Sequence, residues 1–412
     1  MPNYDDLDIC LITGLYPKEN AAEIEQNSIY GIQNAANVFQ WNVVNGIVEN
    51  GVTSMEVINS LYIGSFPRKY RKMIIPSYDF EIHTGIRGSN IGFLNLPVVK
   101  EKFRFYSMKK QLKRWAQNGK KNKVAIAYAA TYPMTKALSY LKRLNPEIET
   151  CLVVPDLPMY MNLSQSKTGL LHRIKDRVVA AEMVKADSYV LLTEQMKKMI
   201  AGSDKRPAAI VEGMVSMQNS GNTEAADTDE KPDYRYFLYT GTLNYQYGIM
   251  DLVNAFEAAD TKDTHLVICG EGEASGEIRD RMKCNGKIHF MGCCSHKKVL
   301  ELQRNAFALV NPRRNEGEYT KYSFPSKIME YMYSGRPAVV YALDGMPEEY
   351  KQYLICIEDK KDGFKDALEY IARQDDAFCD SFGRRAKVFV ATEKNCQAQM
   401  KKVLDLFARD AG

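Results

Sequence analysis

The 412-residue sequence has no long apolar run and no paired-cysteine signature. Its longest apolar stretch, which starts at Val124, is interrupted and contains a proline, so it falls short of the roughly 20 residues that a membrane span needs. The nine cysteines are an odd number without any C-x-x-C spacing, which argues against a disulfide framework or a zinc site and favours reduced thiols. Acids stand at the N-terminus where a signal peptide carries basic residues, so we expect a cytoplasmic protein.

The composition is typical of a soluble globular chain, with 45% apolar and 26% charged residues. At roughly 150–200 residues per domain, the length predicts two domains. The segment 215–235 has almost no apolar content and is interpreted as a linker between a first domain over 1–214 and a second over 236–392. Residues 393–412 predict a terminal helix that crosses back to the first domain.

Short apolar strands alternate with amphipathic helices in both domains, and a long helical region is predicted over roughly 23–50. This rhythm predicts an α/β fold of two doubly wound, Rossmann-like domains, each with a parallel sheet covered on both faces. Ligands of such folds bind at the carboxyl ends of the strands, so we expect a ligand cleft between the two domains.

Positive charge is concentrated in residues 100–123, which hold ten basic side chains and one acid, Glu101, among several aromatic residues. One interpretation is a solvated helix face. The other is a surface that rests on the anionic inner face of the cell membrane, where each Lys or Arg can contribute about 1 kcal/mol. Nucleic acid is not an expected partner, because no nucleic-acid-binding motif accompanies the charge.

Glycines follow predicted strands, at Gly14 in the first domain and at Gly241 and Gly270 in the second. A residue without a side chain at the end of a strand lets a ligand or another backbone approach closely. We interpret the second-domain turns, together with Thr242 and Glu271, as part of a nucleotide-binding edge. Ordinary turn chemistry is the alternative for any single glycine, and the spacing is not that of a dinucleotide motif.

The most informative feature is a polar loop that leads into a helix at Pro325. Ser323 is predicted to cap this helix, and the N–H groups of Ser326, Lys327 and Ile328 are predicted to form an anion site at its positive end. The Lys327 side chain adds a mobile cation to this site.

Two further charged residues belong to the same prediction. Arg313 could reach the anion with a planar fork suited to phosphate. Glu330 lies one turn into the helix, where it could accept hydrogen bonds from ribose hydroxyls. The alternative is a capped surface helix in which Glu330 only forms a salt bridge.

The second domain resembles retaining glycosyltransferases of the GT-B fold, the large group 1 family (family 4-like) whose members build bacterial polysaccharides. The resemblance rests on FLYTGTLNYQYGIMDLVNAF, HLVICGEGE and above all FPSKIMEYMYSGRPAVV. It implies transfer of a hexosyl unit from a nucleotide-sugar, expected to be UDP-linked, to a saccharide or lipid-linked saccharide acceptor with retention, in surface polysaccharide or glycoconjugate synthesis. It also implies that Glu330 binds ribose and that no metal or cofactor is required, because basic groups and helix dipoles stabilise the departing diphosphate.

The sequence departs from the family pattern at three positions. Family members often carry an Arg and a Lys where this chain has Thr242 and Tyr247, and a Glu where it has Tyr322, which we keep among the predicted donor-binding residues. We predict that Arg313 and Lys327 replace the missing cations, because the charge of the leaving group must be neutralised.

The first domain matches the family more loosely, in VVPDLP among other segments. Asp156 of this segment resembles an acid that meets the acceptor or the transferred sugar, and a group that removes a proton must lie within hydrogen-bond reach of the attacking hydroxyl. A helix N-cap is the alternative role. Two other functions remain open for the chain: a nucleotide-sugar epimerase of the same fold, and a non-catalytic nucleotide-binding subunit of another transferase, which the missing cations favour.

Overall fold

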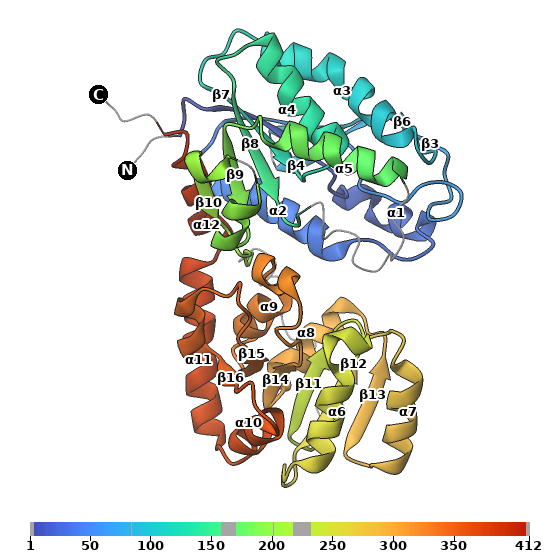
Figure 1. The fold of residues 1–412 in the computed structure, drawn as a ribbon, viewed down its shortest axis with the longest axis vertical. Helices are drawn as coiled ribbons and strands as arrows, with labels where there is room; N and C mark the ends of the chain where they lie inside the picture. The colour runs from blue at the N-terminus through green and yellow to red at the C-terminus, as the bar shows by residue number, and fades with distance from the viewer. Residues whose placement is uncertain (1–3, 84, 158–169, 201, 217–231, 409–412) are drawn as a thin grey trace. The chain divides into compact units, whose positions relative to one another are not determined.

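The computed structural model describes residues 4–83, 85–157, 170–200, 202–216 and 232–408 (Figure 1). The chain forms two compact units, Met1–Met214 with Cys396–Gly412, and Val215–Asn395. Most of the predicted linker lies outside the described residues. The C-terminal helix α12 (Cys396–Leu404) packs on α2 (Asn34–Glu49) of the first unit, where Met400 and Val403 join the buried core.

The first unit is built on an eight-stranded sheet with the order β10-β9-β8-β7-β1-β2-β5-β4. All neighbouring strands are parallel except β4 and β5. The strands are β1 (Asp8–Thr13), β2 (Ser54–Asn59), β4 (Tyr78–His83), β5 (Ile86–Asn90), β7 (Lys123–Tyr128), β8 (Glu149–Val154), β9 (Ser188–Leu191) and β10 (Ala208–Ile210). Every residue of β1 is buried, as expected for a strand covered on both faces.

The helical region predicted over 23–50 is interrupted in the structure. The structure has two helices, α1 (Ala21–Asn27) and α2, separated by a segment that includes Gly31 with φ +76°. The break has a tertiary cause, because Ser28 pairs with Tyr70 in an isolated β-bridge. Beside it, β3 (Ile74–Ile75) and β6 (Phe93–Leu94) form a separate two-stranded antiparallel sheet.

The basic segment 100–123 mostly forms helix α3 (Lys100–Ala116), which packs beside α4 (Tyr132–Leu144); α5 (Leu170–Met183) packs on α4 in turn. Most apolar side chains of α3, including Leu112 and Trp115, are buried, whereas Phe103 and Tyr106 are exposed, as are Lys110 and Lys113. This arrangement favours the interpretation of α3 as a solvated helix face. Among the residues described, no helix combines the length and the apolar character needed to cross a bilayer.

The second unit is a six-stranded parallel sheet with the order β13-β12-β11-β14-β15-β16. Its strands are β11 (Tyr236–Thr240), β12 (His265–Cys269), β13 (Ile288–Gly292), β14 (Ala308–Asn311), β15 (Ala338–Tyr341) and β16 (Ile355–Ile357). Its helices are α6 (Ile249–Ala258), α7 (Ser275–Cys284), α8 (His296–Asn305), α9 (Ser326–Ser334), α10 (Gly363–Ala372) and α11 (Asp376–Glu393).

Helices cover both faces of this second sheet. Alternate residues of β11 point to opposite sides: Phe237 joins a core with α6 and α10, and Leu238 joins a core with α8, α9 and α11. The predicted doubly wound α/β architecture is thus present, and the strand order is that of a Rossmann fold. All nine cysteines are free.

Candidate functional site

The strand order of the second unit identifies where a ligand would bind. The chain runs outward from β11 through β12 to β13, then returns to the other side of β11 with β14. In open α/β sheets, ligands bind beyond the carboxyl ends of the two strands at which the order reverses. The candidate ligand site is therefore formed by the residues that follow Thr240 in β11 and Asn311 in β14.

Helix α9 begins beside this point, and its first turn differs in detail from the prediction. The helix starts at Ser326 after the N-cap residue Pro325, without a side-chain cap. The predicted cap by Ser323 is wrong, because its hydroxyl lies 3.4 Å from Nη2 of Arg313 instead. The predicted free N–H of Ile328 is also wrong, since it donates to the Pro325 carbonyl at 2.9 Å.

Two backbone donors remain at this end of the helix. They are the N–H groups of Ser326 and Lys327, which lie in the first turn, where an α-helix offers no carbonyl partner. Ser326 is exposed and Lys327 is half-buried. A helix end with two N–H donors and an adjacent ammonium group suits a bound anion.

Glu330 is held at the end of β11 by two partners. Nζ of Lys327 lies 2.9 Å from Oε1 and 3.1 Å from Oε2 of Glu330. The amide of Gln303 in α8 donates to the same carboxylate and lies 3.3 Å from Oγ1 of Thr240, the last residue of β11. The salt bridge foreseen as the alternative is therefore present, at a place where both charged side chains keep about a third of their surface exposed (36% and 29%).

Gln303 was not predicted from the sequence. It is a buried amide in α8 (1% exposed) that links the Glu330 carboxylate to the strand end. The only sequence signal for it is a polar residue beside Leu302 on the buried side of an amphipathic helix, which alone does not identify a binding residue.

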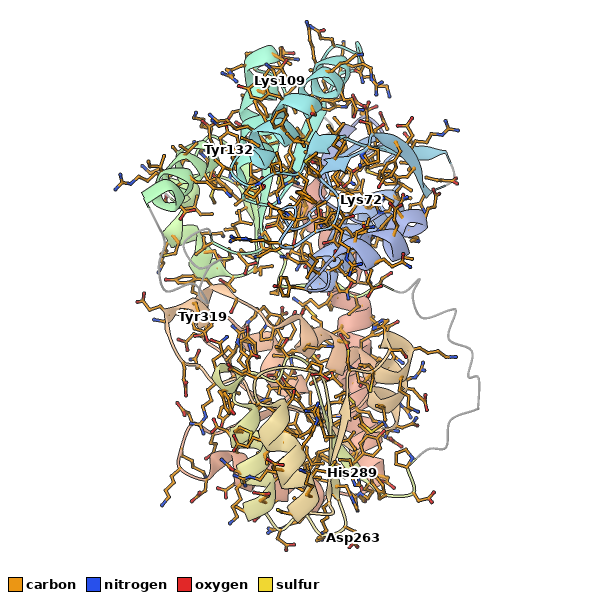
Figure 2. All side chains as sticks on the ribbon, turned by 90° about the vertical axis from the view of Figure 1, so that its right-hand side faces the viewer. Lys72, Lys109, Tyr132, Asp263, His289 and Tyr319 are labelled. Atoms are coloured by element: carbon orange, nitrogen blue, oxygen red, sulfur yellow. The ribbon has the colours of Figure 1, made fainter. Side chains whose placement is uncertain are left out.

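Arg313 follows β14, and its guanidinium lies near two tyrosine rings. The distances to the ring centroids are 5.7 Å for Tyr247 and 5.5 Å for Tyr319, which Figure 2 labels. Its backbone N–H donates to the Asn311 side chain at 3.2 Å. Its Nε is buried and has no hydrogen-bond partner among the described residues. Tyr247, which stands where the family often has a Lys, thus contacts the arginine that we predicted to replace that cation.

The two predicted glycines have different surroundings. A Cβ on Gly270 would lie 1.8 Å from the carbonyl oxygen of Gly241, so this glycine is required by another backbone rather than by a ligand. The three atoms nearest to a Cβ on Gly241 would all belong to the Tyr239 side chain, the closest being its hydroxyl at 3.1 Å.

The remaining predicted donor residues contribute mainly backbone. Thr242 is exposed, and its carbonyl accepts a hydrogen bond from Tyr239 at 2.9 Å. Glu271 is exposed, and its carbonyl accepts from the Leu243 N–H at 3.0 Å. Tyr322 is half-buried and ends the short 3-10 helix Glu318–Tyr322, just before α9.

In the first unit, Gly14 and Asp156 both follow strands near the reversal of strand order at β1 and β7. The Gly14 N–H donates to Oε1 of Gln40 at 2.7 Å, and a Cβ on Gly14 would lie 2.9 Å from Cβ of Tyr62. Gly14 is thus closely approached by protein. Asp156 is exposed, in a bend after β8. Burial raises the pKa of the Tyr128 hydroxyl, at the end of β7, and the Asp156 carboxylate raises this pKa further.

A buried network of amides at this edge was not predicted. Oδ1 of Asn59 accepts from Thr13 at 2.9 Å, and its Nδ2 lies 3.1 Å from the Leu15 carbonyl and 3.0 Å from Oδ1 of Asn90. The network joins the ends of β1, β2 and β5. The residues of this network come from distant parts of the sequence, so no local motif predicts the network.

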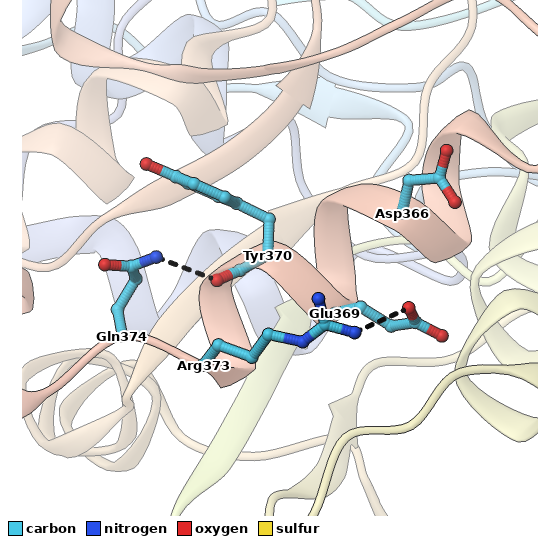
Figure 3. Close-up of a pocket in the computed structure, with 5 residues that line it drawn as sticks. All are labelled: Asp366, Glu369, Tyr370, Arg373 and Gln374. Atoms are coloured by element: carbon cyan, nitrogen blue, oxygen red, sulfur yellow. Dashed lines mark hydrogen bonds and ion pairs between the residues drawn. The ribbon is translucent and has the colours of Figure 1, made fainter.

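A surface depression lies away from these residues, along α10 (Figure 3). It is lined by Asp366, Glu369, Tyr370, Arg373 and Gln374. The Gln374 carbonyl accepts a hydrogen bond from Arg235 at 3.0 Å, and Arg235 precedes the first residue of β11. The depression therefore lies at the amino end of the sheet, opposite the edge where ligands of this fold bind.

The comparisons with known proteins concern this second unit and the whole fold. The family described as glycosyl transferases group 1 matches residues 234–374. A search of curated proteins finds no match. Matched solved structures include the lipopolysaccharide outer core galactosyltransferase WaaB in its apo form, at a TM-score of 0.61 and 14% identity over 97% of this chain and 98% of that one.

Two further matched structures are described with trehalose-6-phosphate or its synthase. The E. coli structure described as trehalose-6-phosphate bound with UDP-2-fluoro glucose has a TM-score of 0.62 and 9% identity over 98% of this chain and 99% of that one. A trehalose-6-phosphate synthase studied for glycosyltransfer with retention has a TM-score of 0.60 and 10% identity, with 96% and 98% covered. Residues 234–374 thus match the glycosyl transferases group 1 family, and the chain as a whole has the GT-B fold of these solved structures.

Proposed function

We propose that this chain transfers a hexosyl unit from a UDP-linked sugar to a saccharide or lipid-linked saccharide acceptor, with retention, in surface polysaccharide or glycoconjugate synthesis. The observation that carries the proposal is the cluster of Lys327, Glu330 and Gln303 beside the start of α9, at the end of β11. The proposal for the donor and for retention is supported by neighbours of the same fold, one described with UDP-2-fluoro glucose and one with transfer with retention.

The donor diphosphate would bind at the start of α9. The N–H groups of Ser326 and Lys327 would donate to its oxygens, and the Lys327 ammonium would turn from Glu330 towards the added negative charge. Gln303 would keep the Glu330 carboxylate in place, so that it could accept hydrogen bonds from the ribose hydroxyls. This exchange is inexpensive because the Lys327–Glu330 pair is partly exposed, and such pairs contribute only about 0–1 kcal/mol.

Arg313 would act as the second cation. Its guanidinium lies near the rings of Tyr247 and Tyr319, and this planar group can donate to two phosphate oxygens at once. Negative charge on the diphosphate grows as the bond to the sugar breaks, so a cation held in place stabilises the transition state more than the bound donor. We expect Arg313→Ala to lower kcat more than it raises the donor KM.

No metal is needed in this proposal, because cations and helix N–H groups neutralise the leaving group. Donor turnover is therefore expected to survive dialysis against EDTA. Asp156 is proposed to contact the acceptor hydroxyl or the transferred sugar. Asp156→Asn should then abolish transfer and leave UDP binding at its original affinity.

One observation favours a second function, nucleotide binding without catalysis. Thr242 and Tyr247 stand where the family often has an Arg and a Lys. A chain of this kind would bind UDP but would neither release it from any UDP-sugar nor transfer the sugar. Turnover by the isolated chain decides between the two functions.

The experiment measures UDP binding by calorimetry and UDP release from a panel of UDP-hexoses with saccharide acceptors. Lys327→Ala is expected to weaken UDP binding at least tenfold, because a charge-assisted contact with phosphate is lost. Lys365→Ala is a matched control in α10: its ammonium is equally exposed at 36% and also pairs with a glutamate, at the opposite edge of the sheet. Equal UDP affinity in both variants would contradict the proposed site.

A further inference from the structure

Five large apolar side chains are exposed within three segments of the first unit. Tyr30 is 81% exposed, Ile74 66% and Val98 84%, and Ile29 and Met73 are each exposed by more than two fifths. Single exposed apolar residues are ordinary on protein surfaces, but a contiguous group marks an interaction site.

Backbone hydrogen bonds join the three segments into one surface. The Ile29 N–H donates to the Lys69 carbonyl at 3.1 Å, which ties the segment after α1 to the segment before β3. The Asn95 N–H donates to the Met73 carbonyl at 2.7 Å, which ties β3 to the segment that leads to Val98. These hydrogen bonds bring the three segments together, and we call their exposed residues, 29–30, 68–69, 71–74 and 98, the Ile74 patch.

The Ile74 patch has a buried side and an open side. Ile74 and Ile75 are consecutive in β3, so their side chains point to opposite faces. Ile75 is 3% exposed and packs with Tyr70 and Phe93 in a small separate core. The outward face of this two-stranded sheet, with Ile74, has no such cover among the described residues.

Positive charge surrounds the open face. Arg68, Lys69, Arg71 and Lys72 are all exposed within one turn-rich segment, and Figure 2 labels Lys72. Glu23 of α1 pairs with Lys72. In the part of the chain that the structure describes, no ion pair is recorded for the other three basic residues of the segment.

Val98 adds a conformational argument. Its φ of +70° is one that a β-branched residue rarely adopts, and its side chain is nevertheless turned to solvent. Both the strain and the exposure cost free energy in the isolated chain. Such strain is typical of sites where a side chain is held for a partner.

We propose that the Ile74 patch docks on an anionic lipid bilayer. Exposed aliphatic and aromatic side chains beside basic ones are the combination that binds at the headgroup boundary, where the apolar groups insert and the cations meet lipid phosphates. Helix α3 exposes only Phe103 and Tyr106 among its large apolar residues, and both are less exposed than Tyr30, Ile74 and Val98.

The test is co-sedimentation of the full chain with vesicles of phosphatidylcholine alone or with 30% phosphatidylglycerol. We expect binding to the anionic vesicles that falls as salt is raised. Arg68→Gln with Arg71→Gln should weaken this binding at least tenfold, since each basic residue near such a surface contributes about fivefold. The matched control is Lys110→Gln with Lys113→Gln, which removes two exposed charges from α3 and should leave binding within twofold.

Val98→Gly separates docking from folding. Glycine accepts a positive φ, so the thermal stability of this variant should be unchanged or higher, whereas its vesicle binding should fall severalfold. The proposal is overturned if the protein binds neutral and anionic vesicles equally or binds neither. It is also overturned if the α3 control loses as much binding as the patch variant.

Discussion

The two units carry sheets of related topology, one wholly and one largely parallel, yet the carboxyl edges of these sheets are built from different chemistry. In the first unit the edge is held by buried side-chain amides, with Asn59 fully buried and bonded to three neighbours. In the second unit glycines let adjacent turns touch backbone to backbone, as Gly270 does with Gly241. The same fold therefore keeps its strand ends together in two ways.

The two units also differ in the burial of a charged cluster. In the first unit Glu182 of α5 is buried (side chain 8% exposed) between Lys136 and Lys185. In the second unit the Lys327–Glu330 pair remains partly exposed. Separating the ions of a buried cluster costs several kcal/mol, whereas a partly exposed pair can release its cation to a ligand at little cost in free energy.

The largest effect is expected from a methyl group added at Gly270. Gly270→Ala should destabilise the second unit by about 4 kcal/mol or more, because its Cβ would lie 1.8 Å from a carbonyl oxygen at a φ of +148°. The matched control is Gly276→Ala in α7, where a Cβ meets nothing within 4 Å. Alanine favours the helix there, so this variant should be up to about 1 kcal/mol more stable. Urea unfolding of both variants checks the pair, and equal stabilities would show that backbone contact does not define this edge.

The first unit should instead lose stability when a polar side chain at the carboxyl edge of its sheet is removed. Asn59→Ala is expected to cost about 3 kcal/mol, because Thr13, Asn90 and the Leu15 carbonyl would lose partners in a dry site. Asn285→Ala should cost less than about 1 kcal/mol, because the Asn285 side chain accepts a single hydrogen bond, from the Lys287 N–H in an exposed turn. Chemical denaturation compares the two variants. A loss below about 1 kcal/mol for Asn59→Ala would show that the amide network does not stabilise this edge.

Glu182 makes the stability of the first unit depend on pH. Burial would raise the pKa of Glu182, but hydrogen bonds from Lys136, Lys185 and Ser139 lower it to about 2, below its ordinary 4.5. The unfolded chain then binds a proton at higher pH than the folded chain does. The contribution of Glu182, on the order of 2 kcal/mol, is complete above about pH 5 and is lost as the pH falls towards 2. Glu182→Gln should remove this difference between pH 6 and pH 3, as measured by thermal unfolding, and an unaltered pH profile in the variant would contradict the assignment.

The smallest change in stability is expected where the largest change in ligand binding is proposed. Lys327→Ala should cost about 0.5 kcal/mol or less in unfolding free energy, because its ion pair is partly exposed. A loss of several kcal/mol would mean that the Lys327–Glu330 pair is a structural element, and the comparison between the two edges would fail.

The second-unit edge could be predicted from the sequence because its elements are local. The end of β14, Arg313, the start of α9 and Glu330 all lie within about 20 consecutive residues, so strand, loop and helix signals point to one place. The errors there concern the first turn of α9, where Ser323 contacts Arg313 rather than capping the helix. Competition between a cap and a tertiary partner cannot be decided from local residues.

The first-unit edge could not be predicted because its elements are distant in sequence. Asn59 and Asn90 meet only after β2 and β5 have paired. The break between α1 and α2 depends in the same way on Ser28 meeting Tyr70 across the chain. Likewise, the charge pattern of residues 100–123 suggested a membrane surface, but it could not show that most apolar side chains of α3 turn inward.

The most direct test of the account is a structure of the chain with bound UDP. We predict that the diphosphate lies against the N–H groups of Ser326 and Lys327, with the Lys327 ammonium moved from Glu330 to a phosphate oxygen. A nucleotide bound elsewhere, or a Lys327–Glu330 pair unchanged beside an empty helix end, would contradict it.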